Sequence, residues 1–157
     1  MKNQILLLAT SIILLSSCMS AKVVNMEDRP YVQVYESLDT SQDDLFLMAN
    51  EWMIKTFNDA ESVIQHSDKE DGVLMGKYLM SGGVSTGLYG TTSDSRVYSI
   101  IDIRVKDDKV RISITPQEWA YYEMSTAPKY TEEEAMKDME NLASSLYQHI
   151  STSNVDF

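Results

Sequence analysis

Cysteine and histidine are nearly absent from this 157-residue chain, which has one of the first and two of the second. The single Cys18 cannot form a disulfide within the chain, so the fold must rest on packing alone. Two histidines leave little material for a metal site or a catalytic triad. Basic residues are also scarce, because 13 Lys and Arg face 24 Asp and Glu, for a net charge of −11. An acidic chain is repelled by nucleic acid and by anionic lipid, so we expect no nucleic-acid partner.

Long hydrophobic runs are absent too, except near the N-terminus. Lys2 precedes an apolar stretch over residues 5–15, which is shorter than the ~20 residues of a membrane-spanning helix. A positive start, an apolar centre and small residues before Cys18 are typical of an export signal. The segment Leu15-Ser16-Ser17-Cys18 resembles a bacterial lipobox. This resemblance implies cleavage before Cys18 and a diacylglycerol group on its sulfur.

These features divide the chain into three expected parts. Residues 1–17 would be the lipoprotein signal peptide, 18–29 the lipidated cysteine with a tether, and 30–157 a single α+β domain. The membrane would be bound through the lipid on Cys18, and two or more acyl chains hold a membrane stably where one does not. Fully extended, the tether would reach no more than ~40 Å.

Hydrophobic periodicity predicts the elements of the domain. Alternating or β-rich segments predict strands at 31–35, 62–66, 73–80, 97–105 and 110–114. Two capping boxes, at 41–44 and 131–134, each precede a helix with an apolar stripe. The stripe residues are Leu45, Met48, Ala49, Trp52, Met53 and Thr56 in the first helix, and Ala135, Met139, Leu142, Ala143, Leu146 and Ile150 in the second. The order β-α-β4-α predicts an antiparallel sheet with two helices packed on one face.

The strands at 97–105 and 110–114 specify their own register. A two-residue turn at Asp107-Asp108 pairs Val105 with Val110, Ile103 with Ile112 and Ile101 with Ile114, all on one face. The same register places Arg104 opposite Arg111 on the other face. Two facing arginines cost some stability, which a diagonal Asp102 would offset, and they indicate that this face is solvent-exposed.

Several segments of the first half together resemble a known family. They are the helix with a central tryptophan over 45–52, Lys55-Thr56-Phe57, the strand Val63-Ile64-Gln65, and the hairpin Asp68-Lys69-Glu70-Asp71-Gly72. They are similar to a bacterial domain of unknown function with a TATA-binding-protein-like (TBP-like) fold, over roughly residues 31–150. The resemblance implies the β-α-β4-α fold and a lipoprotein or secreted protein of Gram-negative gut anaerobes. It implies no catalytic residue, because the family has no established activity. The glycine-rich loop 81–94 looks longer than the usual connection in that family.

The resemblance also bears on location. In relatives, an acidic run just after the lipidated cysteine is associated with export to the cell surface. Residues 19–22 lack that run, so we expect an outer-membrane lipoprotein on the periplasmic face.

Four groups of residues are candidates for a functional site. Arg104 and Arg111 favour an anionic or carboxylate-bearing partner. Aromatic residues of the 116–124 connection would line a groove for a sugar or peptide together with Tyr89 and Tyr98, or else form a core patch. The residues of the connection are Trp119, Tyr121 and Tyr122. The cluster of His66 with Asp68, Glu70 and Asp71 reads as a solvated turn rather than a metal site. Loop 81–94 lacks the lysine of a phosphate-binding loop.

The leading interpretation is a lipid-anchored binding or interaction domain of the cell envelope, without catalytic activity, cofactor or metal. Its partner would be a protein or a small ligand. The alternative is an envelope hydrolase that uses the His66 region and a loop serine. The hydrolase would need His66 within hydrogen-bond reach of a hydroxyl and a carboxylate in one pocket.

Overall fold

Two long antiparallel strands, β7 (Val97–Lys106) and β8 (Lys109–Pro116), form the centre of the main sheet. Their register pairs Val105 with Val110, Ile103 with Ile112 and Ile101 with Ile114, as predicted. The Asp107-Asp108 turn joins the two strands, and Asp108 adopts a φ of 63° there. The four isoleucines on the covered face of this hairpin are completely buried: Ile101, Ile103, Ile112 and Ile114.

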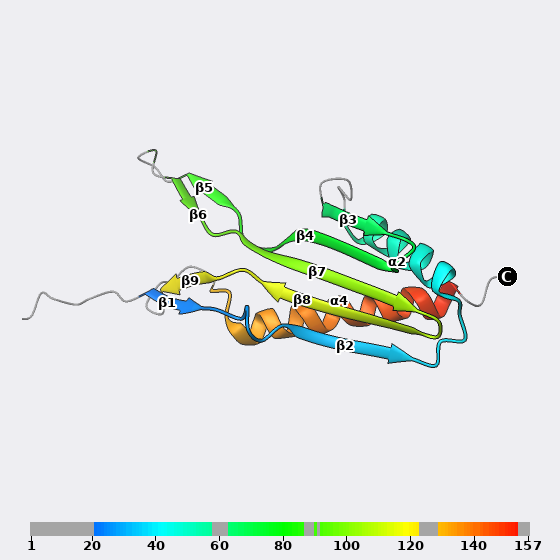
Figure 1. Cartoon of the computed structure of the whole chain (residues 1–157). Coiled ribbons are helices and arrows are strands. Elements are labelled where there is room, and N and C mark those ends of the chain that lie inside the picture. Colours follow the sequence, from blue (N-terminus) through cyan, green and yellow to red (C-terminus); the bar gives the residue numbers. More distant parts are fainter. Residues whose placement is uncertain (1–20, 58–62, 87–89, 91, 123–128, 154–157) are drawn as a thin grey trace, which may run out of the picture.

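The computed structural model describes residues 21–57, 63–86, 90, 92–122 and 129–153. Its main sheet has five antiparallel strands in the order β2-β8-β7-β4-β3. The strands that flank the β7–β8 hairpin are β2 (Tyr31–Glu36) on one side and β4 (Val73–Ser81) with β3 (Ile64–Asp68) on the other. Helices α2 (Gln42–Thr56) and α4 (Glu132–Ser153) both pack on one face (Figure 1). The predicted α+β arrangement and the β-α-β4-α order of the main elements are confirmed.

Both helices begin at the predicted caps. The Ser41 hydroxyl accepts a hydrogen bond from the Asp44 backbone N–H at 3.2 Å. Thr131 and Glu134 form a reciprocal capping box, in which each side chain accepts from the other residue's backbone N–H. The β7–β8 turn adds a tertiary cap to α2, because Asp107 accepts from the Gln42 N–H at 2.9 Å. The hairpin turn therefore also stabilises the start of the helix that covers the sheet.

The buried stripe of α2 differs from the prediction at two positions. Phe46 is buried and Thr56 is exposed. Thr56 is the last residue of the helix, and the half-buried Phe57 takes its place against Trp52, with ring centroids 5.9 Å apart. Trp52 is 3% exposed, as the helix phase predicts, and its indole N–H donates to the Ser145 hydroxyl of α4 at 3.0 Å.

Three stretches expected to be irregular contain strands. The expectation of a tether over 18–29 is wrong from residue 21 onward, because β1 (Ala21–Val24) pairs with β9 (Trp119–Tyr122) and Met26 is 1% exposed. The aromatic connection therefore supplies a strand, β9. Loop 81–94 contains the pair β5 (Val84–Thr86) and β6 (Thr92–Asp94). Both two-stranded ribbons lie at the end of the molecule opposite the Asp107-Asp108 turn (Figure 1).

Candidate functional surface

The face of the main sheet opposite the helices carries the two predicted arginines. Side chains alternate along β7 and β8, so the residues between the buried isoleucines point away from α2 and α4. Arg104 and Arg111 are opposite each other there, as predicted. The register adds neighbours from the other strands that sequence reasoning did not assign: Val32, Val34 and Glu36 of β2, Val73, Met75, Lys77 and Leu79 of β4, and His66 and Asp68 of β3.

This open face has a mixed basic and apolar character. Its basic residues outnumber its acidic ones, and several apolar side chains on it are substantially exposed. The basic residues are Lys77, Arg104, Lys106, Lys109 and Arg111, and the acidic ones are Glu36, Asp68 and Asp102. Val32, Val34 and Leu79 are 43%, 42% and 47% exposed. The helices on the other side are acidic, with Glu132, Glu133 and Glu134 in the first turn of α4.

The ion pairs on the open face leave Arg111 without an acidic partner. Asp102 pairs with Arg104, whose Nε lies 3.1 Å from Oδ1, and this hydrogen bond raises the pKa of Arg104. Asp102 thus offsets the cost of the two facing arginines through Arg104, its neighbour two positions along β7, rather than through a diagonal pair with Arg111. Lys109 pairs with Glu36 at 3.2 Å. Among the described residues, Arg111 has no such pair.

Tyr98 belongs to the same face, at its other end. Its ring lies under two cations, with Lys77 Nζ 4.7 Å and Arg96 Cζ 5.8 Å from the ring centroid. Cations over an aromatic face attract it electrostatically. Tyr98 and the arginines are therefore brought together on one surface, although they do not touch.

The other three predicted aromatic residues are not part of this face. Trp119 is 7% exposed and its indole N–H donates to the Tyr130 carbonyl at 2.7 Å, so it belongs to the core. Tyr121 and Tyr122 lie on β9, in the separate ribbon with β1. The structure thus assigns Trp119 to the core patch and offers no shared groove for Tyr98, Trp119, Tyr121 and Tyr122 in the described residues. Tyr89 lies outside the described residues.

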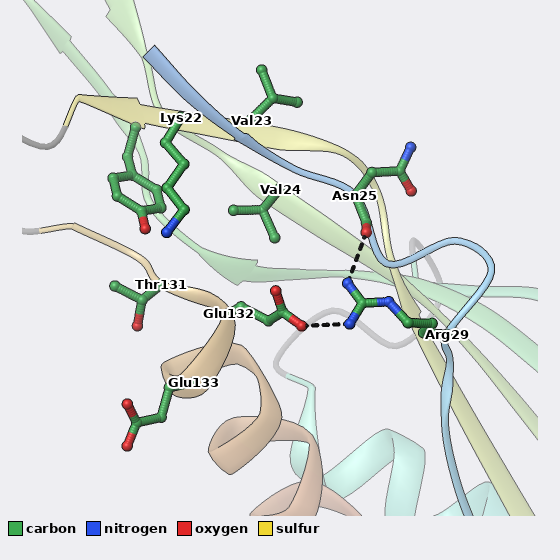
Figure 2. A pocket seen from close by; sticks show the side chains of 9 residues that line it. Lys22, Val23, Val24, Asn25, Arg29, Thr131, Glu132 and Glu133 are labelled. Atoms are coloured by element: carbon green, nitrogen blue, oxygen red, sulfur yellow. Dashed lines mark hydrogen bonds and ion pairs between the residues drawn. The ribbon is translucent and has the colours of Figure 1, made fainter. Parts of the chain in front are cut away.

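Tyr121 lines a hollow of about 420 Å³ at the start of α4. Figure 2 shows Lys22, Val24 and Arg29 approaching Glu132 there. Arg29 and Glu132 are already paired with each other. Arg29 Nη1 lies 2.8 Å from Glu132 Oε1, and its Nη2 donates to the Asn25 carbonyl. The Arg29 guanidinium is therefore already engaged by the protein itself.

The geometry that the hydrolase hypothesis needs is not found around His66. The side chain is exposed on β3, and no hydrogen bond or ion pair joins it to any described residue. Within the ranges that the structure describes, no three His, Cys, Asp or Glu side chains are grouped to hold a metal ion.

Gly72 ends the turn after β3 with the expected positive φ of 65°.

The membrane prediction concerns residues outside the described part. Cys18 and the apolar stretch before it lie in residues 1–20. No helix in the described ranges has the length and apolar character needed to cross a bilayer.

Comparison with known proteins identifies the domain. The family described as "Domain of unknown function (DUF4468) with TBP-like fold" matches residues 31–118. A TBP-like protein from Parabacteroides distasonis superimposes with a TM-score of 0.52 at 16% identity, covering 77% of this chain and 91% of that one. A DUF4468 family protein from Bacteroides ovatus gives a TM-score of 0.45 at 14% identity, with 79% and 83% covered. No curated protein matches. The element order, the register of the sheet and the family match agree: this chain belongs to the DUF4468 family and has its TBP-like fold.

Proposed function

We propose that this protein is a lipid-anchored binding domain of the cell envelope, without catalytic activity, and that its open sheet face binds an acidic partner protein. The lipid on Cys18 holds it to the outer membrane, on the periplasmic side. The observation that carries the binding proposal is Arg111, a basic side chain on an uncovered sheet face with no acidic partner among the described residues.

Charge distribution supports an acidic partner. The whole chain carries a net charge of −11, yet the open face gathers basic side chains while the helical side is acidic. Opposite potentials steer association and set the orientation of docking. An arginine that has no ion pair with the described residues, as Arg111 has none, offers a planar fork of donors to a carboxylate.

The shape of the surface favours a protein over a small molecule. The exposed apolar residues Val32, Val34 and Leu79 are spread from β2 to β4 across the width of the sheet. Small ligands are usually held in concave sites, whereas protein interfaces combine a broad apolar area with a polar rim. A partner that covers several strands would bury all three residues.

The anchor is tested at Cys18. Changing Cys18→Ser removes the thiol that would accept lipid, so the variant should lose metabolic fatty-acid label and leave the membrane fraction. A variant that still labels and still sediments with membranes would contradict the lipid anchor.

The binding surface is tested with the soluble chain from Met19, which retains every described residue. Immobilised protein captures partners from an envelope extract, and mass spectrometry identifies them. Arg104→Glu with Arg111→Glu should abolish capture of a partner that the unchanged domain retains.

The matched control is Lys55→Glu with Lys137→Glu. It changes net charge by the same amount, but on exposed positions of α2 and α4. Equal loss in both double variants would show that net charge, rather than the open face, governs capture. Capture of nucleic acid instead of protein would also contradict the proposal.

A further inference from the structure

The β1–β9 ribbon has two faces of different character. Lys22, Val24, Trp119 and Tyr121 alternate on the inner face, where Val24 and Trp119 are buried and Lys22 Nζ lies 5.7 Å from the Tyr121 ring centroid. Figure 2 shows Lys22 and Val24 directed toward the start of α4 and Val23 directed away. The ribbon is thus held to the domain by its inner face.

The outer face of the ribbon consists of four uncharged residues, Ala21, Val23, Ala120 and Tyr122. All four are exposed, with Val23 at 57% and Tyr122 at 49%. An exposed face without a single charge stands out in a chain with 24 acidic residues. The acidic residue that directly precedes β9, Glu118, lies at the inner end of the ribbon. Its carboxylate accepts a hydrogen bond from the Asn25 side chain.

The position of this face relative to Cys18 indicates what covers it. Only Met19 and Ser20 separate Cys18 from Ala21, the first residue of β1. Consecutive Cα atoms are about 3.8 Å apart, so three steps span no more than about 11 Å. If Cys18 is lipidated, as proposed above, the ribbon cannot move far from the bilayer surface.

We infer that the outer face of the β1–β9 ribbon lies on the lipid bilayer and orients the domain there. Tyr122 provides an aromatic ring with a polar hydroxyl, the kind of side chain that is enriched at membrane interfaces. Acyl chains supply the affinity, and the uncharged ribbon meets the membrane without bringing acidic side chains against it. The Asp107-Asp108 turn lies at the end of the molecule opposite this contact (Figure 1).

This arrangement gives the anchored domain a defined orientation. The long axis of β7 and β8 runs from the ribbon end toward the Asp107-Asp108 turn, so this turn is the part of the hairpin farthest from the ribbon (Figure 1). The inference therefore deepens the proposed function, on whose lipid anchor it rests. It replaces a freely tethered domain with one of defined orientation.

The test uses the full chain, expressed with fatty-acid label and purified from membranes. Val23→Cys, Tyr122→Cys and the control Leu47→Cys each introduce one new thiol, which is labelled with a small fluorophore. Leu47 is 51% exposed, a fraction similar to that of Val23, but it lies on α2, away from the ribbon. The proteins are reconstituted into phosphatidylethanolamine and phosphatidylglycerol vesicles that contain lipids with a nitroxide quencher near the headgroup.

The expected result is several-fold stronger quenching at positions 23 and 122 than at 47. Equal quenching at all three positions in a protein that carries the acyl label would overturn the orientation and leave the anchor standing. A protein without acyl label, in which Cys18 also takes the fluorophore, would overturn both. Adding Val23→Glu to the Tyr122→Cys protein should reduce quenching at 122, whereas Leu47→Glu should not.

Discussion

The two faces of the β7–β8 hairpin differ although the same two strands form both. On the covered face, Ile103 and Ile112 are completely buried under the helices. One position away on each strand, the Arg104 side chain is 56% exposed and Arg111 faces it without an acidic partner in the described chain. The alternation of side chains along a strand thus separates the residues that stabilise the core from those available to a partner.

The largest effect is expected on the covered side, at Trp52. Trp52→Ala removes a ring that packs against Phe57 and a hydrogen bond to Ser145. Unfolding in denaturant should show a loss of about 3–5 kcal/mol, the usual range for a large aromatic cavity. Trp52→Phe, which keeps much of the packing, should lose less. A loss under about 1 kcal/mol for the alanine variant would contradict the burial of this face.

Neighbouring residues of β7 provide the sharpest comparison. Ile103→Ala should lower the free energy of unfolding by about 2–5 kcal/mol, because it leaves a cavity under α2 and α4. Arg104→Ala, one position away, should change it by no more than about 0.5 kcal/mol, since an exposed ion pair contributes little. Similar losses for the two variants, measured by urea unfolding, would break the distinction between the faces.

A smaller effect is expected at Gly76, which lies opposite Ile101 on the covered face of β4. A Cβ at this position would lie 2.8 Å from the Met53 Cε of α2 and 2.8 Å from the Val63 carbonyl. Gly76→Ala should therefore destabilise by about 1–3 kcal/mol through overpacking. Gly83→Ala is the control, because nothing lies within 4 Å of its Cβ position. Equal melting temperatures for the two variants would show that α2 does not approach the sheet this closely.

The smallest effect concerns pH and compares the two histidines. Burial, together with nearby Lys55, lowers the pKa of His149, against the opposite influence of Glu51. A histidine whose pKa is lower in the folded state favours the folded state when neutral. Stability is therefore fully present above the unfolded pKa of about 6.5 and declines as the pH falls below it.

Urea unfolding between about pH 7.5 and pH 5.5 measures this decline around the ordinary histidine pKa. His149→Gln should reduce the slope of stability against pH. His66→Gln, which changes the exposed histidine of β3, is the matched variant. An unchanged slope in His149→Gln, or the same change in both, would contradict a role for burial at His149.

Much of the fold could be predicted because the signals are local. Alternating isoleucines and a two-residue turn determine the register of residues 101–114, since a slip by one residue would bury arginine. Ser41 and Thr131 cap their helices through residues only three positions away. Gly72 adopts the positive φ that the turn requires.

The ribbon could not be predicted in the same way. β1 pairs with β9 across about a hundred residues of sequence, and four-residue strands carry too little periodicity to be recognised alone. The aromatic residues of the candidate site were divided for the same reason. Trp119 and Tyr122 lie in one short strand, yet the first is buried and the second exposed, according to which side of β9 meets the domain.

The sequence by itself determined the order of the main elements, the helix caps, the hairpin register and the face on which Arg104 and Arg111 lie. Those properties depend on residues close in the chain, where side-chain alternation and capping chemistry act directly. Only the tertiary structure decided that Asp102 pairs with Arg104, that residues 21–24 form a strand, and that an uncharged ribbon face lies beside the proposed lipid site. Each of these depends on which distant segments pack together, and that choice is made by the whole core.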